Sequence, residues 1–156
     1  MATTSELPHE IWTALESDDA GPLDAIIRRQ RQEDFELFRR ILNDVNAPEL
    51  YRMRSMYALG RWGDPSVVPD IVRAMETLSD RGRISAIDAL GRLRSEAALD
   101  TLVTYAKHPS PHVRKTVANA LARIDTPLAQ AELQAIAVRD PEDWVRKVAQ
   151  KKTRAQ

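Results

Sequence analysis

A five-residue motif returns at a fixed interval along this chain and sets what the chain can fold into. The stretch Ala58–Trp62 reads Ala-Leu-Gly-Arg-Trp, and close copies follow 31 and 62 residues later at Ala89–Leu93 and Ala120–Ile124. Similarity at a constant period of roughly 20–50 residues is the signature of a protein built from stacked structural repeats. We therefore expect an array of similar units, each about 31 residues long.

Helix start signals divide each interval into two helices. A capping residue followed by proline recurs at Asp64-Pro65, Ser110-Pro111 and Thr126-Pro127. A proline at the first helical position costs nothing, because the amide there has no partner within the helix. Apolar residues at helical spacing follow each signal. The predicted helices begin near residues 5, 23, 35, 48, 64, 79, 95, 110, 126 and 140. The second and third could be one bent helix, but the apolar pattern is interrupted at residues 30–34, which favours two.

These patterns predict an all-α protein. Aromatic residues make up only 5% of the chain, so the core must be aliphatic, and this suits closely packed short helices. We expect a right-handed α-solenoid of stacked antiparallel helix pairs, with about four to five repeats and roughly nine to ten helices in one domain over residues 1–156. Residues 47–153 would carry the repeats, and residues 5–46 would form divergent cap helices. The small residues at Gly60, Gly91 and Ala122 would let neighbouring helices approach closely.

The repeat resembles a known family. An Asp-Pro turn, a Val-Arg pair and Ala-Leu-Gly-x-Leu, followed by an acidic or serine turn and an apolar helix, are similar to the HEAT-like repeats of phycobilisome lyases and many bacterial scaffolds. In HEAT repeats an aspartate and an arginine six positions apart form a ladder that holds the repeats in register, and Asp140 and Arg146 match this spacing. The ladder arginines would be Arg52, Arg83, Arg114 and Arg146. Asp80 could act beside Arg83, whereas no acid precedes Arg114.

The resemblance also implies that the second helix of each pair lines a concave face. The polar positions of these helices fall into three rows: Arg54, Ser85 and Thr116; Tyr57, Asp88, Asn119 and Lys151; Arg61, Arg92 and Arg123. The third row, called the arginine row below, could bind carboxylates or phosphates through guanidinium groups one repeat apart. It could equally reflect the favourable place of arginine at a helix C-terminus. Arg94, Lys115 and Lys147 extend the basic edge.

The three tryptophans are expected to play different parts. Trp62 takes the place of Leu93 and Ile124 in the motif, which predicts a core residue. Trp12 lies on an apolar stripe and is expected in the core or against the end of the stack. Trp144 stands where the preceding repeats have polar residues, so it either contacts a partner or covers the open C-terminal end of the stack.

No motif in the chain predicts catalysis. There is no cysteine, so no disulfide or thiolate site can form, and we expect a reducing compartment, the cytoplasm. His108 and His112 are four residues apart, but Pro109 and Pro111 prevent a helical metal-binding pair. We find no phosphate-binding glycine loop, nucleophilic serine motif or zinc-protease motif. The sequence therefore predicts no catalytic residues, metal or cofactor. It also shows no signal peptide or membrane-spanning segment.

Charge is unevenly distributed, and this bears on the kind of partner. Residues 1–50 hold 5 basic and 11 acidic residues, whereas residues 51–156 hold 18 and 12. We expect a non-enzymatic scaffold or adaptor that binds an acidic or helical segment of another protein. The predicted partner-binding residues are Arg54, Tyr57, Arg61, Asp88, Arg92, Asn119, Arg123, Trp144, Lys147 and Lys151. Two alternatives are nucleic-acid binding through the arginine row and, by fold analogy, a subunit of an enzyme resembling bilin lyases. The oligomeric state is left open.

The predicted facing of the helices can be tested by two substitutions in one motif copy. Leu90→Ala should lower the free energy of unfolding by about 2–5 kcal/mol, because it truncates a buried side chain. Arg92→Ala should cost less than about 1 kcal/mol if that residue faces solvent. Urea denaturation of the two variants measures both values. Comparable losses would show that the facing is wrong.

Overall fold

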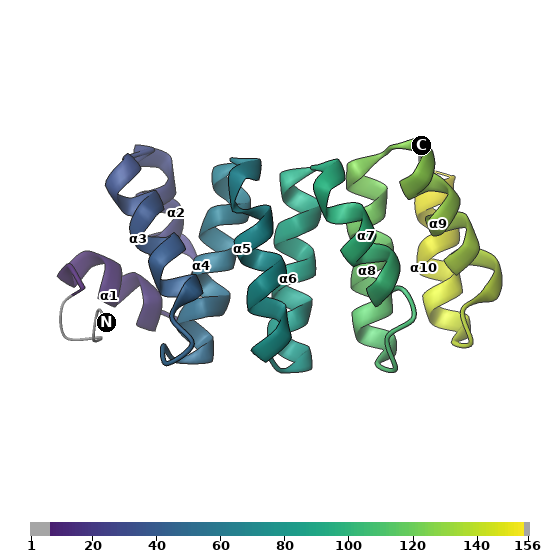
Figure 1. Ribbon diagram of the computed structural model, residues 1–156, viewed down its shortest axis with the longest axis horizontal. Helices are drawn as coiled ribbons and strands as arrows, with labels where there is room; N and C mark the ends of the chain where they lie inside the picture. Colours follow the sequence, from purple (N-terminus) through teal and green to yellow (C-terminus); the bar gives the residue numbers. More distant parts are fainter. Residues whose placement is uncertain (1–6, 155–156) are drawn as a thin grey trace.

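The computed structural model describes residues 7–154, which form two layers of helices stacked side by side (Figure 1). Ten α-helices and three 3-10 helices lie within this range: α1 (His9–Glu16), α2 (Gly21–Arg29), α3 (Gln32–Asn43), α4 (Glu49–Trp62), η2 (Pro65–Val67), α5 (Val68–Ala74), η3 (Met75–Thr77), α6 (Asp80–Leu93), η4 (Glu96–Ala98), α7 (Leu99–Tyr105), α8 (Pro111–Ile124), α9 (Pro127–Arg139) and α10 (Asp143–Thr153). The outer layer consists of α3, α5, α7 and α9, and the inner layer of α4, α6, α8 and α10. The predicted α-solenoid is confirmed. Among these helices none is long and apolar enough to cross a bilayer.

The start signals locate most helices correctly. Ser79 and Thr126 accept hydrogen bonds from backbone amides in the first turns of α6 and α9, as N-caps do. Asp64 caps a 3-10 turn that leads into α5, so this outer helix is not α-helical from its start. The interruption at residues 30–34 separates α2 from α3, and Gln30 there adopts a left-handed conformation with φ 52°.

The first helix begins later than predicted. It starts at His9, after Pro8 at the N-cap, rather than near residue 5. Ser5, the residue near which this helix was predicted to begin, lies outside the described residues. Trp12 is 42% exposed and stacks on His9, so of the two places expected for it the structure shows the end of the stack and not the core. Trp62 is half-buried and packs its ring against Phe35 at the edge of the core.

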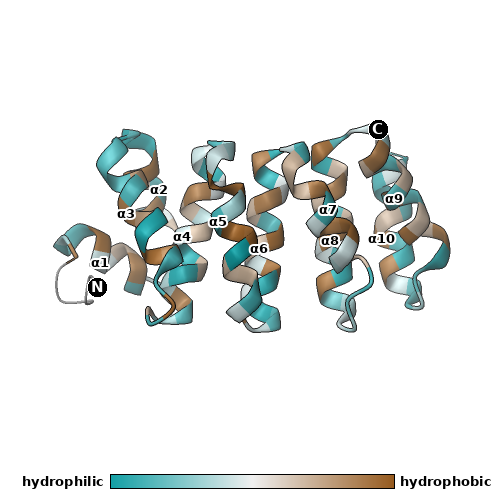
Figure 2. Ribbon diagram, in the orientation of Figure 1, coloured by the Kyte–Doolittle hydropathy of each residue, from teal (hydrophilic) through white to brown (hydrophobic). Residues whose placement is uncertain are grey.

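The core runs between the two layers as one aliphatic cluster from Ile11 to Ala149. Figure 2 shows hydrophobic residues distributed along the whole stack, on both layers, with no single central patch. Leu59, Leu90 and Leu121, the leucines of the three motif copies, are at most 1% exposed. Each repeat therefore completes the core of its neighbours, as expected of a solenoid.

The inner helices approach most closely at the glycines of the motif. A Cβ atom placed on Gly60 would lie 2.9 Å from the Cα atom of Ala89, and one on Gly91 would lie 2.7 Å from the Cα atom of Ala120. The obstructing atoms belong to the backbone of the next inner helix, so they cannot move aside by a change of rotamer. The glycine of one repeat thus packs directly against the alanine of the next. This confirms the predicted close approach of neighbouring helices at Gly60 and Gly91.

Gly91→Ala should therefore destabilise the protein, although alanine is the better helix former by roughly 1 kcal/mol. The overlap with Ala120 forces α6 and α8 apart, and overpacking of this kind typically costs about 1–3 kcal/mol. Gly21→Ala is the matched control, because the nearest atom there is the side-chain carboxylate of Asp19 on an exposed turn. Thermal unfolding compares the two. An equal or higher melting temperature for Gly91→Ala would contradict the close approach.

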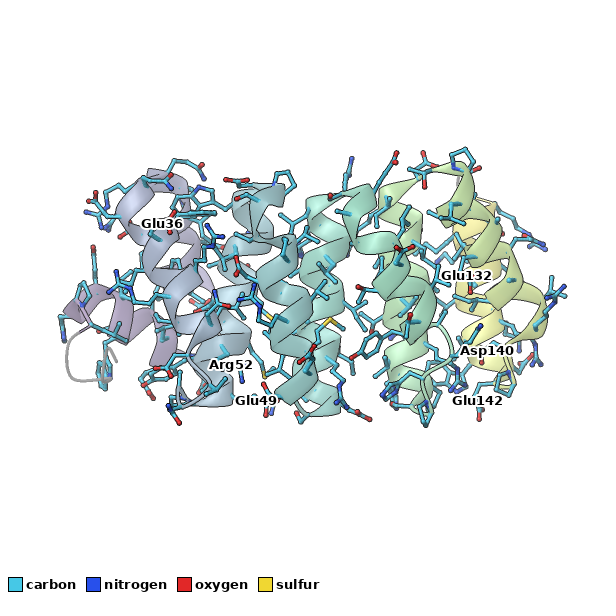
Figure 3. All side chains as sticks on the ribbon, viewed as in Figure 1. Glu36, Glu49, Arg52, Glu132, Asp140 and Glu142 are labelled. Atoms are coloured by element: carbon cyan, nitrogen blue, oxygen red, sulfur yellow. The ribbon has the colours of Figure 1, made fainter. Side chains whose placement is uncertain are left out.

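The ladder arginines connect each inner helix to the turns beside it. Arg52 donates to the carbonyl of Leu42 at the end of α3 and to Thr77 after α5 (Figure 3). Arg83 donates to the carbonyl of Met75 and pairs with Asp80 at 3.2 Å, so the predicted role of Asp80 is confirmed. Unpaired carbonyls at helix C-termini need a donor, and these guanidinium groups supply it.

Arg114 completes the ladder in a way that its own sequence neighbourhood did not reveal. Its Nε and Nη2 atoms donate to the two carboxylate oxygens of Asp140 at 2.8 and 3.1 Å, and Nη1 donates to the carbonyls of His108 and Pro109. The acid therefore comes from the turn between α9 and α10, which belongs to the next repeat (Figure 3). Asp140 and Arg146 do match the HEAT spacing, but Arg146 donates to the backbone carbonyl of Asp140.

The Arg114–Asp140 pair is buried, with side chains only 7% and 2% exposed. Burial by itself would raise the pKa of Asp140. The hydrogen bonds from Arg114 and from the backbone N–H of Glu142 outweigh that effect and lower this pKa below its usual range. The pKa of Arg114 is raised by its hydrogen bond to Asp140.

Asp140→Ala should cost about 3–5 kcal/mol of unfolding free energy, because it leaves Arg114 buried without its counter-charge. Asp140→Asn should cost less and should also report the linkage to pH. Because folding lowers the pKa of Asp140, its contribution is present above the unfolded-state pKa and is lost as pH falls through the lower folded-state value. Urea denaturation from about pH 6 to pH 2.5 should therefore show the gap between wild type and Asp140→Asn narrowing. A gap that is independent of pH would contradict this account.

Candidate functional site

The ten predicted partner-binding residues all lie on the inner helices α4, α6, α8 and α10, and all are exposed or half-buried. They follow one another from repeat to repeat, so the stack brings them onto a continuous surface, called the inner face below. Whether they bind a partner stays a prediction. Their ionic contacts, however, differ strongly from one helix to the next.

Two members of the arginine row share one carboxylate. Arg92 Nε donates to Asp88 Oδ2 at 2.8 Å within α6, and Arg123 Nη1 donates to Asp88 Oδ1 at 2.6 Å from α8. About a third of each of the three side chains is exposed. Burial would raise the pKa of Asp88, but the hydrogen bonds from Arg123 and Arg92 outweigh it and lower this pKa. The cluster keeps one net positive charge and ties the two repeats together.

The remaining member of the row pairs with the N-terminal helices. Arg61 Nε lies 3.2 Å from Asp24 Oδ1 of α2, and the Tyr57 hydroxyl donates to the same oxygen at 2.9 Å. The guanidinium of Arg61 also stacks over the Tyr57 ring, 5.5 Å from its centroid. The pKa of Tyr57 is raised by burial and by the hydrogen bond to Asp24.

A second acidic contact covers the start of the same helix. Arg54 donates to the backbone carbonyl of Leu15 and lies 3.9 Å from Asp18. The Tyr51 hydroxyl donates to Glu16 nearby. The acidic N-terminal segment therefore packs on α4. It contacts all three predicted binding residues of that helix, Arg54, Tyr57 and Arg61.

The inner face is less occupied towards the C-terminus. Asn119 and Lys151 make no side-chain hydrogen bond or ion pair within residues 7–154, and Lys147 pairs with Asp143 on its own helix at 2.6 Å. Trp144 is 37% exposed, with its ring 5.3 Å from that of His112. The segment 143–154 carries five basic residues and one acidic residue, so positive charge is concentrated here.

A pocket of about 250 Å³ lies at the other side of α6, lined by Arg83, Thr104, Tyr105 and His108. Arg83 already bonds Met75 and Asp80, and the Nδ1 atom of His108 accepts from the backbone N–H of Ser110. Arg83 and His108, two of the polar residues that line the pocket, are therefore already hydrogen-bonded within the arginine ladder and the turn before α8. The described part of the chain holds no group of three or more His, Cys, Asp or Glu placed to bind a metal ion.

Sequence reasoning identified the basic residues of the inner face but missed Asp24 and did not pair Asp88. Asp88 lies 35 residues before Arg123, and Asp24 lies 37 residues before Arg61. A search for acids about one repeat plus one helical turn before each arginine of the row would have found Asp88, whereas Asp24 lies two residues further from its arginine, in a segment without the repeat motif. The third arginine, Arg92, meets Tyr57 at the corresponding place, and its charge acts to lower the pKa of that hydroxyl against the larger effects that raise it.

Comparison with known proteins agrees with this geometry. The model of the HEAT repeat family matches residues 76–152. Among solved structures, human deoxyhypusine hydroxylase in complex with glycerol is similar, with a TM-score of 0.66 and 30% sequence identity over 78% of this chain. The chain spans 44% of the length of that hydroxylase. No curated protein sequence matches the chain. The matched repeats, the likeness to this structure and the arginine ladder identify the chain as a HEAT-like repeat protein.

Proposed function

We propose that this protein is a non-enzymatic scaffold or adaptor that binds an acidic, helical segment of another protein on its inner face. The observation that supports this most is the way the chain's own acidic segment packs on α4. Asp24 there engages Arg61 and Tyr57 together, which is the contact that a carboxylate of a partner would make.

The repeat geometry extends the same chemistry to the helices that follow. Arg92 and Arg123 stand at the place of Arg61, and Asn119 and Lys151 continue the row of Tyr57. Asp88 neutralises only one of the two arginines, so a partner carboxylate can join the cluster as a second anion. Charge-assisted hydrogen bonds to guanidinium groups are stronger than neutral ones, and planar arginine favours carboxylates in particular.

The C-terminal part of the inner face supplies the apolar anchor that protein interfaces need. Trp144 is exposed beside His112, and tryptophan and arginine are enriched among residues that dominate binding energy. The unpaired Lys151 lies on the same helix. An acidic helix across α6, α8 and α10 would thus meet basic groups and, at one end, an aromatic side chain.

Nucleic-acid binding is the less favoured alternative. The overall charge is zero, and two of the three arginines of the row already share an internal carboxylate. A binder of the phosphate backbone typically presents a strongly basic surface whose binding falls steeply with salt.

The likeness to deoxyhypusine hydroxylase supports a second candidate function. A chain with 30% identity to an enzyme could act on a related substrate or assist such an enzyme. Hydroxylation of a deoxyhypusine-containing protein, assayed by mass spectrometry with and without this chain, tests that possibility directly.

The proposed function is tested with a helical peptide carrying glutamates along one face and with the same peptide carrying glutamines. We expect the glutamate peptide to bind at least about tenfold more tightly, which corresponds to roughly 1.4 kcal/mol. The triple variant Arg92→Gln, Arg123→Gln and Lys151→Gln should lose this preference. Calorimetric titration measures both affinities, and a duplex DNA probe with a salt series tests the alternative.

The matched control removes the same charge elsewhere. Arg28→Gln, Arg40→Gln and Lys107→Gln change exposed residues that lie outside the inner helices and have no ionic partner in the described range. Equal loss in both triple variants would mean that only net charge matters. Retention of the preference in the inner-face variant would contradict the assignment of the site.

A further inference from the structure

Helix α9 differs from the other outer helices on its solvent side. Leu128 and Val138 are 53% and 64% exposed, and Ala131 and Ala135 lie between them. At 3.6 residues per turn these four positions fall within about 80° of the helix circumference, opposite the buried side of α9. They form a continuous apolar stripe roughly 15 Å long, called the α9 stripe.

The preceding repeats show that this stripe is not required by the fold. The same four positions are Ser66, Pro69, Arg73 and Glu76 around α5, and Ala97, Asp100, Thr104 and Lys107 around α7. Six of these eight residues are polar or charged, and all eight are exposed. Of these three outer helices only α9 places leucine and valine there, so the stacking of the repeats does not account for them.

The stripe is also distinct from the face that stacks on a neighbouring repeat. In α5 that face carries Val68 and Val72, whereas α9 has Gln130 and Gln134 at the equivalent positions. Both glutamines are exposed. The exposed apolar residues of α9 therefore lie on its solvent side and not on the side where a further repeat would stack.

The order of side chains along the stripe is self-complementary. Two large residues stand at the ends and two alanines in the middle. When two copies of α9 are placed antiparallel about a two-fold axis, Leu128 of one lies opposite Val138 of the other, and Ala131 lies opposite Ala135. Small residues at the centre allow two helices to approach closely, and larger residues at the ends close the contact.

The charges along one edge of the stripe fit the same arrangement. Glu132 and Arg139 lie seven residues apart on this edge, and neither has an ion pair within residues 7–154. In an antiparallel pair, Arg139 of each copy is directed toward Glu132 of the other. A parallel pair would instead place this edge of the two copies on opposite sides of the contact, where Glu132 and Arg139 could not pair.

We propose that the α9 stripe is a homodimer interface, in which two copies of this chain pair through antiparallel α9 helices. The interface is isologous, as a two-fold axis requires, and it leaves the inner face of both copies open. A contact made by one helix from each copy lies at the small end of protein interfaces, so association is expected in the micromolar range. This inference does not depend on the proposed function.

Sedimentation equilibrium from about 5 to 500 µM tests the dimer. The wild type should approach twice its 17.6 kDa mass as concentration rises. Leu128→Glu should remain at the monomer mass with an unchanged melting temperature, because the residue is exposed. Ser66→Glu, the same change at the equivalent position two repeats earlier, should dimerise like wild type. A wild type that stays monomeric throughout, or a Leu128→Glu variant that still dimerises, would overturn the proposal.

A charge swap tests the pairing of the edges. Arg139→Glu should weaken dimerisation at least about fivefold, and the double variant Glu132→Arg with Arg139→Glu should restore it, because the exchange keeps opposite charges facing each other. Equal weakening in the single and double variants would overturn the antiparallel pairing.

The register is tested with cysteines, since the natural chain has none. A mixture of Ala131→Cys and Ala135→Cys proteins should form a disulfide-linked heterodimer under mild oxidation. Each protein alone should cross-link much more slowly. Faster cross-linking of either single variant with itself would show a different register and overturn the proposed arrangement.

Discussion

The stack depends on how closely neighbouring inner helices approach. Gly60 receives Ala89, and Gly91 receives Ala120, at distances that leave no room for a Cβ atom on the glycine. This approach places the arginines of one repeat within reach of the acids of the repeat before it. A wider spacing would leave Arg123 too far from Asp88 to form the 2.6 Å hydrogen bond. Packing of small residues therefore determines the electrostatics of the surface.

Arginine serves two separate purposes in this stack. Two of the ladder arginines, Arg52 and Arg114, are buried between the turns, and Arg114 donates to both carboxylate oxygens of Asp140 and to two backbone carbonyls. The arginine row lies on the inner face and stays about a third exposed. Removing a buried charge partner is costly, whereas exposed pairs contribute little to stability. The row is thus expected to contribute less to stability than the buried ladder pair.

Much of the architecture follows from local patterns. The capping residues, the prolines at helix starts and the apolar spacing predict the helices, and the repeated motif predicts the close approach of α4, α6 and α8. The partners of the charged groups were harder to infer. Asp140 reaches back to Arg114, and Asp24 reaches Arg61 across a segment that lacks the repeat motif. Such pairings depend on how one repeat is rotated against the next, which no single repeat encodes. The sequence also left open whether Trp12 lies in the core or at the end of the stack, and it is exposed because an apolar stripe at the end has no further repeat to cover it.

The acidic N-terminal segment covers α4, so the ionic contacts of the inner face differ between α4 and the helices that follow it. On α4, Arg54 and Arg61 lie beside Asp18 and Asp24 of the N-terminal segment, whereas Arg92 and Arg123 share Asp88 alone and keep one net positive charge. The most direct test of this account is to follow the side-chain Nε–Hε signals of the arginines by NMR as the glutamate peptide is added. The account predicts that Arg92 and Arg123 shift while Arg61 keeps its signal and its contact with Asp24. Displacement of Arg61 as the main response, or no shift in any of the three, would contradict it.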